Sequence, residues 1–151
     1  MKRKLLLVAL LFVTLNGFSQ IWTKIEAKNG MHYITNNMEF INIPLLGTYL
    51  FKGKEPLVEL NQYGEGFYQL HDQLKRPMIW GLECDESGAL LYKKGFENSK
   101  YILWYQYTTN SENDSEEDKN WKMVEFTMHF KTLKMFIQGE RSKDYIETVE
   151  K

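Results

Sequence analysis

Hydrophobic and polar side chains alternate along much of the chain with the two-residue period of a β-strand. The clearest case begins at Met78, where Met78, Trp80 and Leu82 share one face and the residues between them share the other. Residues 101–108 also alternate, but both of their faces carry large groups, which is typical of a central strand or one covered on both sides. The pattern therefore predicts a mostly β fold.

Turn residues separate these segments at short intervals. Asn29-Gly30 lies between two strand-like runs and favours a tight hairpin, because both residues tolerate positive φ. About ten short strands with so little room for crossover helices predict an antiparallel meander that closes into a barrel or forms a strongly curved sheet. At the end of the chain, Ser142 as N-cap and Asp144 in the first turn predict a short C-terminal helix over residues 142–150.

The first 19 residues follow a different pattern. Basic residues at positions 2–4 precede an apolar run from Leu5 to Leu15, and a short stretch of small and polar residues leads to Gln20. This order is typical of a secretory signal peptide. The apolar run is shorter than the about 20 residues that span a bilayer. We therefore expect cleavage before Gln20, an exported protein of the periplasm or the exterior, and no stable membrane insertion after cleavage.

The rest of the chain suits one domain. We expect residues 20–46 to form an N-terminal hairpin and a lead-in strand over 38–43, and residues 47–151 to form the main antiparallel part of the same domain. Removal of the signal peptide, with its three basic residues, lowers the net charge from −1 to −4. A mildly acidic domain is a poor candidate for binding nucleic acid.

Reactive side chains are present, but they form no catalytic or metal-binding motif. His32, His71 and His129 lie on separate segments without zinc-ligand spacing, and the acidic loop 110–120 lacks the residue order and the turn glycine of a calcium site. No metal or cofactor is therefore expected. Cys84, the single cysteine, allows no internal disulfide and is interpreted as a buried small hydrophobe rather than a reactive thiol.

Two carboxylates on one strand leave an enzymatic alternative open. Glu83 and Asp85 share a strand face, and paired carboxylates perform acid–base catalysis when they lie in a cleft. A solvent-exposed strand face is the favoured interpretation. An enzyme that uses Glu83, Asp85, His71 or Glu140 ranks last among the functional hypotheses, and no catalytic residue is assigned.

Aromatic residues make up 15% of the chain and are its most informative functional feature. The interior of a barrel of about eight strands is either filled by side chains or holds one small ligand. Tyrosine and tryptophan bring polar groups that seek partners when buried, which favours a pocket, while an ordinary core remains the alternative. The candidate ligand-binding residues are Tyr49, Phe51, Trp80, Tyr101, Leu103, Tyr105, Phe126 and Met128.

Two short motifs carry a family resemblance. Gly47-Thr48-Tyr49 lies on an early strand, a long meander follows, and a late strand ends in Gly139-Glu140-Arg141. Over residues 47–141 this arrangement resembles the lipocalin-like (calycin) barrel, in which an arginine near the end of the last strand packs over a Gly-x-Trp on the first. The resemblance implies a barrel that binds a small apolar molecule, closed by Arg141 against Tyr49 or a neighbouring aromatic ring. The chain is also similar to small exported proteins of envelope-rich bacteria.

Two functional hypotheses follow. The first is an exported, non-enzymatic barrel-like protein that binds a small apolar or amphipathic ligand in an aromatic-lined interior. The alternative is a cell-envelope module, structural or protein-binding, that acts through an exposed aromatic sheet face at residues 101–108.

Overall fold

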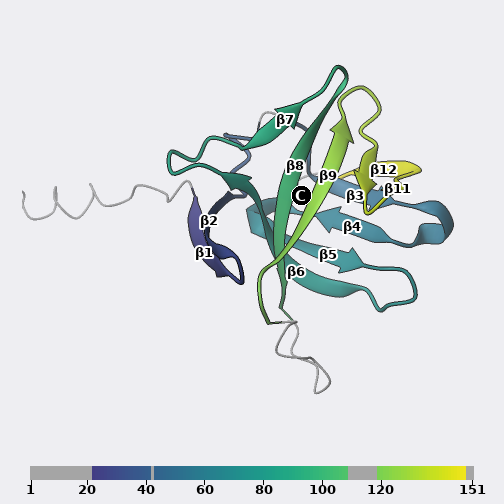
Figure 1. The fold of residues 1–151 in the computed structure, drawn as a ribbon. Coiled ribbons are helices and arrows are strands. Elements are labelled where there is room, and N and C mark those ends of the chain that lie inside the picture. Colours follow the sequence, from purple (N-terminus) through teal and green to yellow (C-terminus); the bar gives the residue numbers. More distant parts are fainter. Residues whose placement is uncertain (1–21, 42, 109–118, 149–151) are drawn as a thin grey trace, which may run out of the picture.

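The computed structural model describes residues 22–41, 43–108 and 119–148. The predicted signal peptide and residues 110–118 of the acidic loop lie outside this part of the chain. The described residues form a mostly β fold in which one antiparallel sheet curls into a half-barrel (Figure 1). The predicted antiparallel meander is confirmed in this form.

Twelve strands and two short 3-10 turns make up the elements of the described residues. They are β1 (Thr23–Ala27), β2 (Gly30–Thr35), β3 (Gly47–Leu50), η1 (Lys52–Lys54), β4 (Leu57–Leu60), η2 (Gln62–Gly64), β5 (Glu65–Gln69), β6 (Arg76–Cys84), β7 (Tyr92–Lys94), β8 (Asn98–Tyr107), β9 (Lys122–His129), β10 (Met135–Ile137), β11 (Glu140–Arg141) and β12 (Asp144–Glu147). The main path runs β11-β10-β9-β8-β6-β5-β4-β3-β12. The strand pair β1–β2 joins β6 through β2, and β7 joins β8.

The concave side of the sheet holds the main hydrophobic core. Met78, Trp80 and Leu82 of β6 are buried in it, as their alternation predicts, while Ile79 between them is exposed. The inward residues of β8, from Tyr101 to Tyr107, belong to the same cluster. The period of two along each strand therefore translates directly into one filled interior.

The hairpin of β1 and β2 covers the outer side of β8. Ile25 and Ile34 of the hairpin form a second buried cluster with Trp104, which points away from the main core. Gly81 of β6 makes this approach possible, because a Cβ at that position would lie 2.9 Å from Ile34 Cδ1. The expectation that residues 101–108 are covered on both faces is thus confirmed.

One short segment pairs with both ends of the strand path. β11 pairs with β10, and β12 pairs with β3. Between them the Ser142 amide donates to the Met135 carbonyl (2.8 Å), and the Lys143 amide donates to the Leu50 carbonyl (2.7 Å). The two ends of the curled sheet are therefore held together at this segment, at the right of Figure 1.

The predicted C-terminal helix is wrong. As far as residue 148, the chain continues as strand β12 in register with β3. Ser142 does not act as an N-cap, since its buried Oγ accepts a hydrogen bond from the Met135 amide. The edge of β3 offers backbone partners along the whole of β12, and the Tyr145 ring packs on Tyr49 with centroids 4.9 Å apart. Tertiary pairing overrides the weak local capping signal.

The predicted lead-in strand over 38–43 is also wrong for the residues described. The Phe40 amide donates to the Asn37 carbonyl (3.1 Å), and the Glu39 amide donates to Asn37 Oδ1 (3.0 Å). Asparagine side chains that bond to a backbone amide two residues on are typical of turns. The segment still contributes to the main core, since Ile41 and Leu45 are buried there.

Candidate ligand-binding site

The eight residues predicted to contact a ligand lie together in the main core. Their exposed fractions run from 0% for Tyr49 to 6% for Tyr105. Tyr101 is the one member of the set that lines an open pocket among the pockets described below. The eight side chains thus share one interior, but that interior is filled by their own packing and seven of them reach none of the pockets described below.

Polar groups inside this interior largely bond to the protein itself. The Tyr49 hydroxyl donates to the Leu45 carbonyl (2.9 Å), and Trp80 Nε1 donates to the Glu65 carbonyl (2.7 Å). Burial raises the pKa of Tyr49 and of Tyr68 far above the ordinary value, so both stay neutral. The Tyr68 hydroxyl has no hydrogen-bond partner among the described residues. The internal hydrogen bonds of Tyr49 and Trp80 are typical of aromatic residues in a dry core.

An open pocket of about 730 Å³ lies where β7 and the first half of β8 meet the segment before β3. We call it the β7 pocket. Its apolar walls come from Phe40, Ile43, Leu90, Tyr92, Tyr101 and Phe130. The volume falls in the range of about 300–1,000 Å³ that is common for small-molecule sites.

The turn between β6 and β7 shapes one wall of this pocket. Asp85 Oδ1 accepts hydrogen bonds from the amides of Ser87 (2.8 Å) and Ala89 (3.0 Å). Hydrogen bonds from Ser87 and Ala89 hold the pKa of Asp85 below its ordinary value. A β-bridge between Cys84 and Leu90 then returns the chain to β6. Asp85, considered as a catalytic carboxylate, is therefore a turn-forming residue.

An aromatic ladder connects the pocket wall with the core. Tyr92, Tyr101 and Phe126 are successive cross-strand partners on β7, β8 and β9, and each neighbouring pair of rings has its centroids 5.6 Å apart. Burial raises the pKa of the Tyr101 phenol, and the adjacent Ser99 hydroxyl partly offsets the effect. Ser99 Oγ is buried, lines the pocket and makes no hydrogen bond of normal geometry with the described residues. The pocket thus combines apolar walls with a polar atom that has unused bonding capacity.

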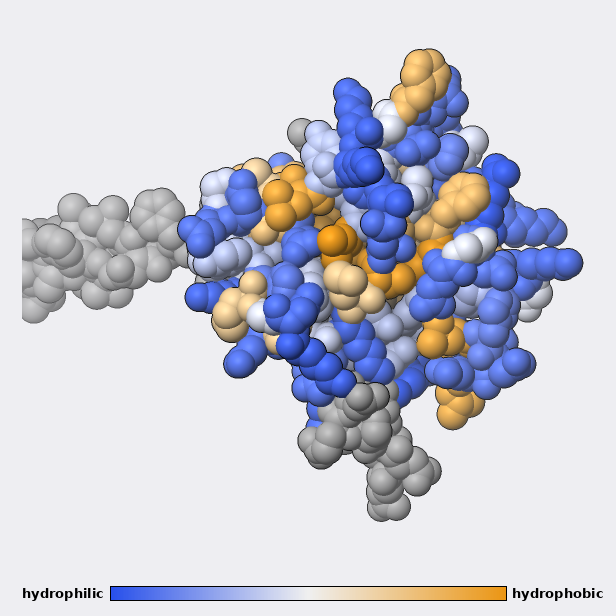
Figure 2. All heavy atoms as spheres, in the orientation of Figure 1, coloured by the Kyte–Doolittle hydropathy of each residue, from blue (hydrophilic) through white to orange (hydrophobic). Residues whose placement is uncertain are grey.

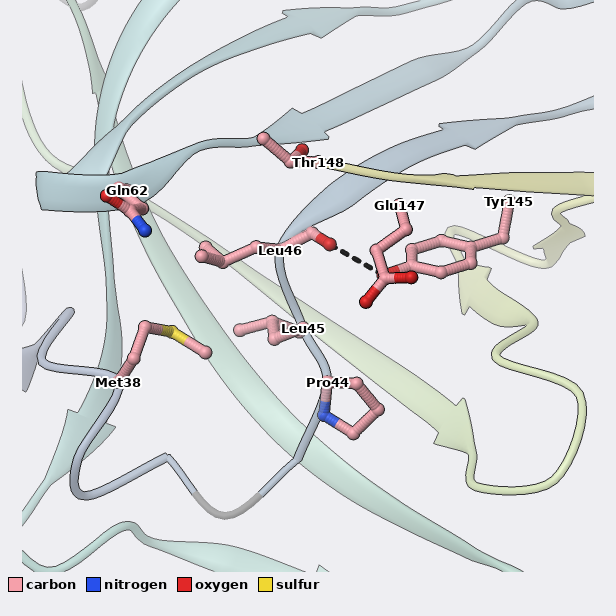
Figure 3. A pocket seen from close by; sticks show the side chains of 8 residues that line it. All are labelled: Met38, Pro44, Leu45, Leu46, Gln62, Tyr145, Glu147 and Thr148. Atoms are coloured by element: carbon pink, nitrogen blue, oxygen red, sulfur yellow. Dashed lines mark hydrogen bonds between the residues drawn. The ribbon is translucent and has the colours of Figure 1, made fainter. Parts of the chain in front are cut away.

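A second, smaller pocket of about 450 Å³ lies on the segment before β3 (Figure 3). Met38 and Leu45 line it from that segment, and Tyr145 and Glu147 line it from β12. The Tyr145 hydroxyl donates to the Leu46 carbonyl (2.6 Å), drawn as the dashed line in Figure 3. Since Pro44 lines both pockets, this segment is their shared wall.

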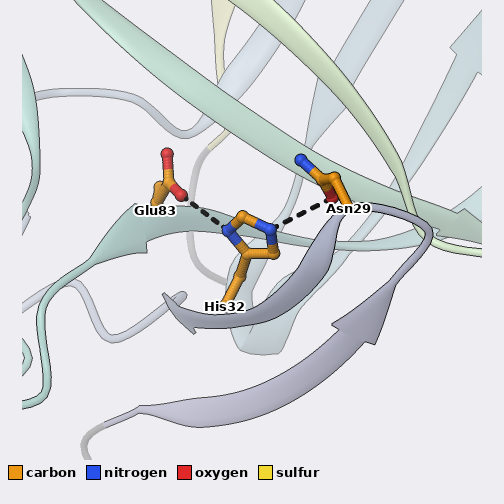
Figure 4. A network of polar contacts seen from close by, with 3 residues as sticks. All are labelled: Asn29, His32 and Glu83. Atoms are coloured by element: carbon orange, nitrogen blue, oxygen red, sulfur yellow. Dashed lines mark hydrogen bonds and ion pairs between the residues drawn. The ribbon is translucent and has the colours of Figure 1, made fainter.

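His32, which is partly buried, links two parts of the sheet (Figure 4). His32 Nδ1 lies 2.9 Å from Glu83 Oε1, and Nε2 lies 3.1 Å from Asn29 Oδ1. The ring also contacts Trp104, with centroids 4.4 Å apart. Both ring nitrogens are engaged and neither partner is a serine, threonine or cysteine, so the arrangement joins the hairpin to β6 and is not a hydrolytic triad.

The other predicted reactive groups do not assemble into a site. His71 Nε2 lies 3.6 Å from Glu140 Oε1, but both side chains are half exposed. Burial raises the pKa of the Cys84 thiol to about 11, which makes it a poor nucleophile at neutral pH. Within the residues described, no group of three or more histidine, cysteine, aspartate or glutamate side chains is placed to hold a metal ion.

Arg141 lies over Phe136, its cross-strand neighbour on β10, at 5.5 Å from the ring centroid. The ring that packs on Tyr49 is instead that of Tyr145. The exposed Arg141 therefore makes the contact expected from the lipocalin-like motif with Phe136 and not with Tyr49. The Tyr49 ring packs against β12 instead.

The aromatic sheet face at residues 101–108 is not exposed. Tyr101, Trp104 and Tyr107 are all buried, Trp104 beneath the hairpin and the two tyrosines in the main core. A large exposed hydrophobic side chain occurs instead at the tip of the β7–β8 hairpin, where Phe96 is 99% exposed. Figure 2 shows a mostly hydrophilic face from which a hydrophobic side chain projects at that tip.

Sequence reasoning missed Phe40, Tyr92 and Phe130 as pocket residues. Phe40 and Phe130 lie in turns outside the alternating strands, and Tyr92 is on the short strand β7. The sequence offered no signal for this grouping, because the local pattern predicts a strand at Phe40 and the structure places that residue in a turn. Their grouping depends on how three separate connections converge at one edge of the sheet.

No family model, curated protein or solved structure matches the chain. None of the helical elements in the described residues is long and apolar enough to cross a membrane. The class that the structure defines is therefore a curled antiparallel β half-barrel with buried aromatic clusters, a fold consistent with binding.

Proposed function

We propose that this protein is an exported, non-enzymatic, lipocalin-like binding protein that takes a small apolar or amphipathic ligand in the β7 pocket. The observation that carries the proposal is the open pocket of about 730 Å³, whose aromatic wall continues through Tyr92 and Tyr101 into the core. Export rests on the pattern of residues 1–19, and the lipocalin-like relation rests on the motifs around Tyr49 and Arg141.

The walls of the pocket supply the driving force for binding. Phe40 and Phe130 are each 39% exposed, so a ligand would remove their apolar surface from water. Each methylene group buried contributes about 0.8 kcal/mol. Ser99 lines the same pocket, and its Oγ makes no hydrogen bond of normal geometry with a described residue. Together with the exposed Lys94 and Glu39 it suits a ligand with one polar end.

Binding is tested with 1-aminoanthracene, a fluorescent apolar probe, and with native mass spectrometry of the purified protein for retained small molecules. We expect saturable fluorescence enhancement, and several-fold weaker binding in Phe130→Ala and Tyr92→Ala because each removes part of the pocket wall. Phe96→Ala is the matched control, since Phe96 is exposed and does not line the pocket. No saturable binding, or equal loss in the control, would reject the pocket as the binding site.

Export is tested by expressing the full chain in a bacterial host and determining the N-terminus of the protein in each fraction. We expect a mature protein that begins at Gln20 outside the cytoplasm. A protein that keeps residues 1–19 and stays in the cytoplasm would contradict the proposal.

A further inference from the structure

Four basic residues line one groove where the two ends of the sheet are held together. The groove has a volume of about 540 Å³. Lys52 comes from η1, Lys134 from the turn between β9 and β10, and Arg141 and Lys143 from the segment of β11 and β12, with Ser142 between them. We call this the seam groove. Two regions far apart in the sequence, at residue 52 and at residues 134–143, thus bring positive charge to one place.

Three lysines of the seam groove have no ion-pair partner among the described residues, whereas three lysines elsewhere do. Lys75, Lys100 and Lys131 form ion pairs with Glu59, Glu125 and Glu97 at 2.9, 2.6 and 2.5 Å. Lys52, Lys134 and Lys143 form no ion pair with any described residue.

The two acidic residues that flank residues 141–143 in the sequence do not supply the missing ion pairs. Glu140 lies 3.6 Å from His71, and Asp144 is an exposed residue of β12 that is not part of the groove lining. Clustered like charges repel one another and raise the local positive potential, here on a chain whose net charge is −1. An anion in the groove would relieve that repulsion.

The backbone beneath these charges is fixed. The amides of Ser142 and Lys143 bond to Met135 and Leu50 on the two ends of the sheet. Ser142 is buried and its Oγ accepts from the Met135 amide at 2.8 Å. A hydroxyl also donates one hydrogen bond, and no described residue accepts the Ser142 proton. The groove therefore has a floor held by hydrogen bonds to both ends of the sheet, with an unused donor at Ser142 among cationic side chains.

We propose that the seam groove binds a phosphate-class oxyanion, either free or as the phosphate of a lipid headgroup. Lysines act as point charges toward phosphate, and an arginine adds a planar set of donors that remains available while the guanidinium stacks on a ring, as Arg141 does on Phe136. The groove is separate from the β7 pocket in its lining residues, so the two proposals fail independently.

The test is an amide chemical-shift titration with inorganic phosphate at constant ionic strength. We expect saturable shifts at residues 52–54, 134–135 and 141–143, with a Kd of about 1 mM or tighter. The double variant Lys134→Gln/Lys143→Gln should weaken binding about tenfold or more, because it removes half of the groove's basic residues. Lys24→Gln/Lys93→Gln changes the net charge equally at exposed positions outside the groove and should leave the Kd unchanged.

Vesicles separate the two sources of the phosphate group. Binding to phosphatidylglycerol vesicles but not to phosphatidylcholine vesicles, lost in the groove variant, would identify a lipid headgroup. Saturable phosphate binding without vesicle binding would identify a free oxyanion. The proposal is overturned if phosphate gives no saturable shifts and the two kinds of vesicle bind alike, or if the control variant weakens binding as much as the groove variant does.

Discussion

The two faces of β8 are both covered by apolar side chains, but different structures cover them. The inner face packs into a cluster to which β3, β4, β5, β6, β9 and β10 all contribute. The outer face, around Trp104, is covered by the single hairpin of β1 and β2. One strand thus belongs to two cores that differ in how many elements hold them together.

The difference lies in how each core can open. The hairpin joins the sheet through three residue pairs between β2 and β6 and through polar contacts of His32 with Glu83 and of Tyr33 with Glu86. The inner cluster opens only if several strands separate at once. Regions with few buried contacts open locally, and this opening costs less free energy than global unfolding of the domain. The comparison therefore predicts a cooperative inner core and an outer hairpin that detaches by itself.

The largest effect is expected from Trp80→Ala in the inner core. The ring is buried and Nε1 donates to the Glu65 carbonyl, so the variant leaves a cavity and removes one of the two hydrogen bonds that this carbonyl accepts. We expect the free energy of unfolding to fall by about 3–5 kcal/mol, measured by urea denaturation. Phe96→Ala, at an exposed site, should change it by less than about 0.5 kcal/mol. Similar losses in both variants would show that the interior is not the cooperative core.

A smaller effect is expected from Trp104→Ala in the outer cluster. The variant removes the ring on which Ile25, Ile34 and His32 pack. We expect a loss of about 2–3 kcal/mol, below the usual range for a buried tryptophan because the hairpin can detach while the inner core persists. Amide hydrogen exchange should become faster in β1 and β2 but not in β4 or β9. A uniform increase over all strands would contradict the separation of the two cores.

A third variant, Gly81→Ala, tests the contact between the hairpin and β6. The added Cβ would lie 2.9 Å from Ile34 Cδ1, so the hairpin must shift. Overpacking of this kind lowers the free energy of unfolding by about 1–2 kcal/mol. Adding Ile34→Val removes the atom in closest contact, and the double variant should lose less than the sum of the two single losses. Strict additivity would show that the hairpin does not press on Gly81.

The smallest effect concerns the pH dependence contributed by Cys84, on the part of β6 that pairs with the hairpin. Burial raises the pKa of its thiol from 9.0 to about 11. Above pH 9 the unfolded chain releases this proton and the folded chain keeps it, so the thiol lowers stability as pH rises from 9 to 11. Buried tyrosines act in the same direction, so the readout is a comparison with Cys84→Ala. We expect the variant to lose less stability between pH 8 and pH 11, and an equal loss would contradict a buried thiol.

Much of the strand pattern could be read from local sequence, for reasons that particular residues make clear. Asn29-Gly30 predicted a hairpin, and Ala27 pairs with Gly30 across that turn. The alternation at Met78, Trp80 and Leu82 predicted one buried face. These signals are local because side-chain direction in a strand depends only on the backbone of that strand.

Other features depend on partners distant in the sequence. The segment 142–148 has a plausible helix cap, yet it forms a strand because β3 and β10 present open edges to it. The eight residues proposed as ligand contacts lie in one buried cluster, but the β7 pocket depends on Phe40 and Phe130, whose turns meet only after folding. No pattern within either turn indicates the other.

The sequence by itself determined most of the strands, which of their faces turn inward and that the aromatic residues share a core, because these follow from backbone geometry and the hydrophobic effect within short windows. Only the tertiary structure decided that the sheet curls into a half-barrel held together at Ser142, that the hairpin covers Trp104, and that pockets open at the β7 edge and at the seam. Those outcomes depend on which edges and turns meet, and such long-range contacts are set by the packing of the whole chain.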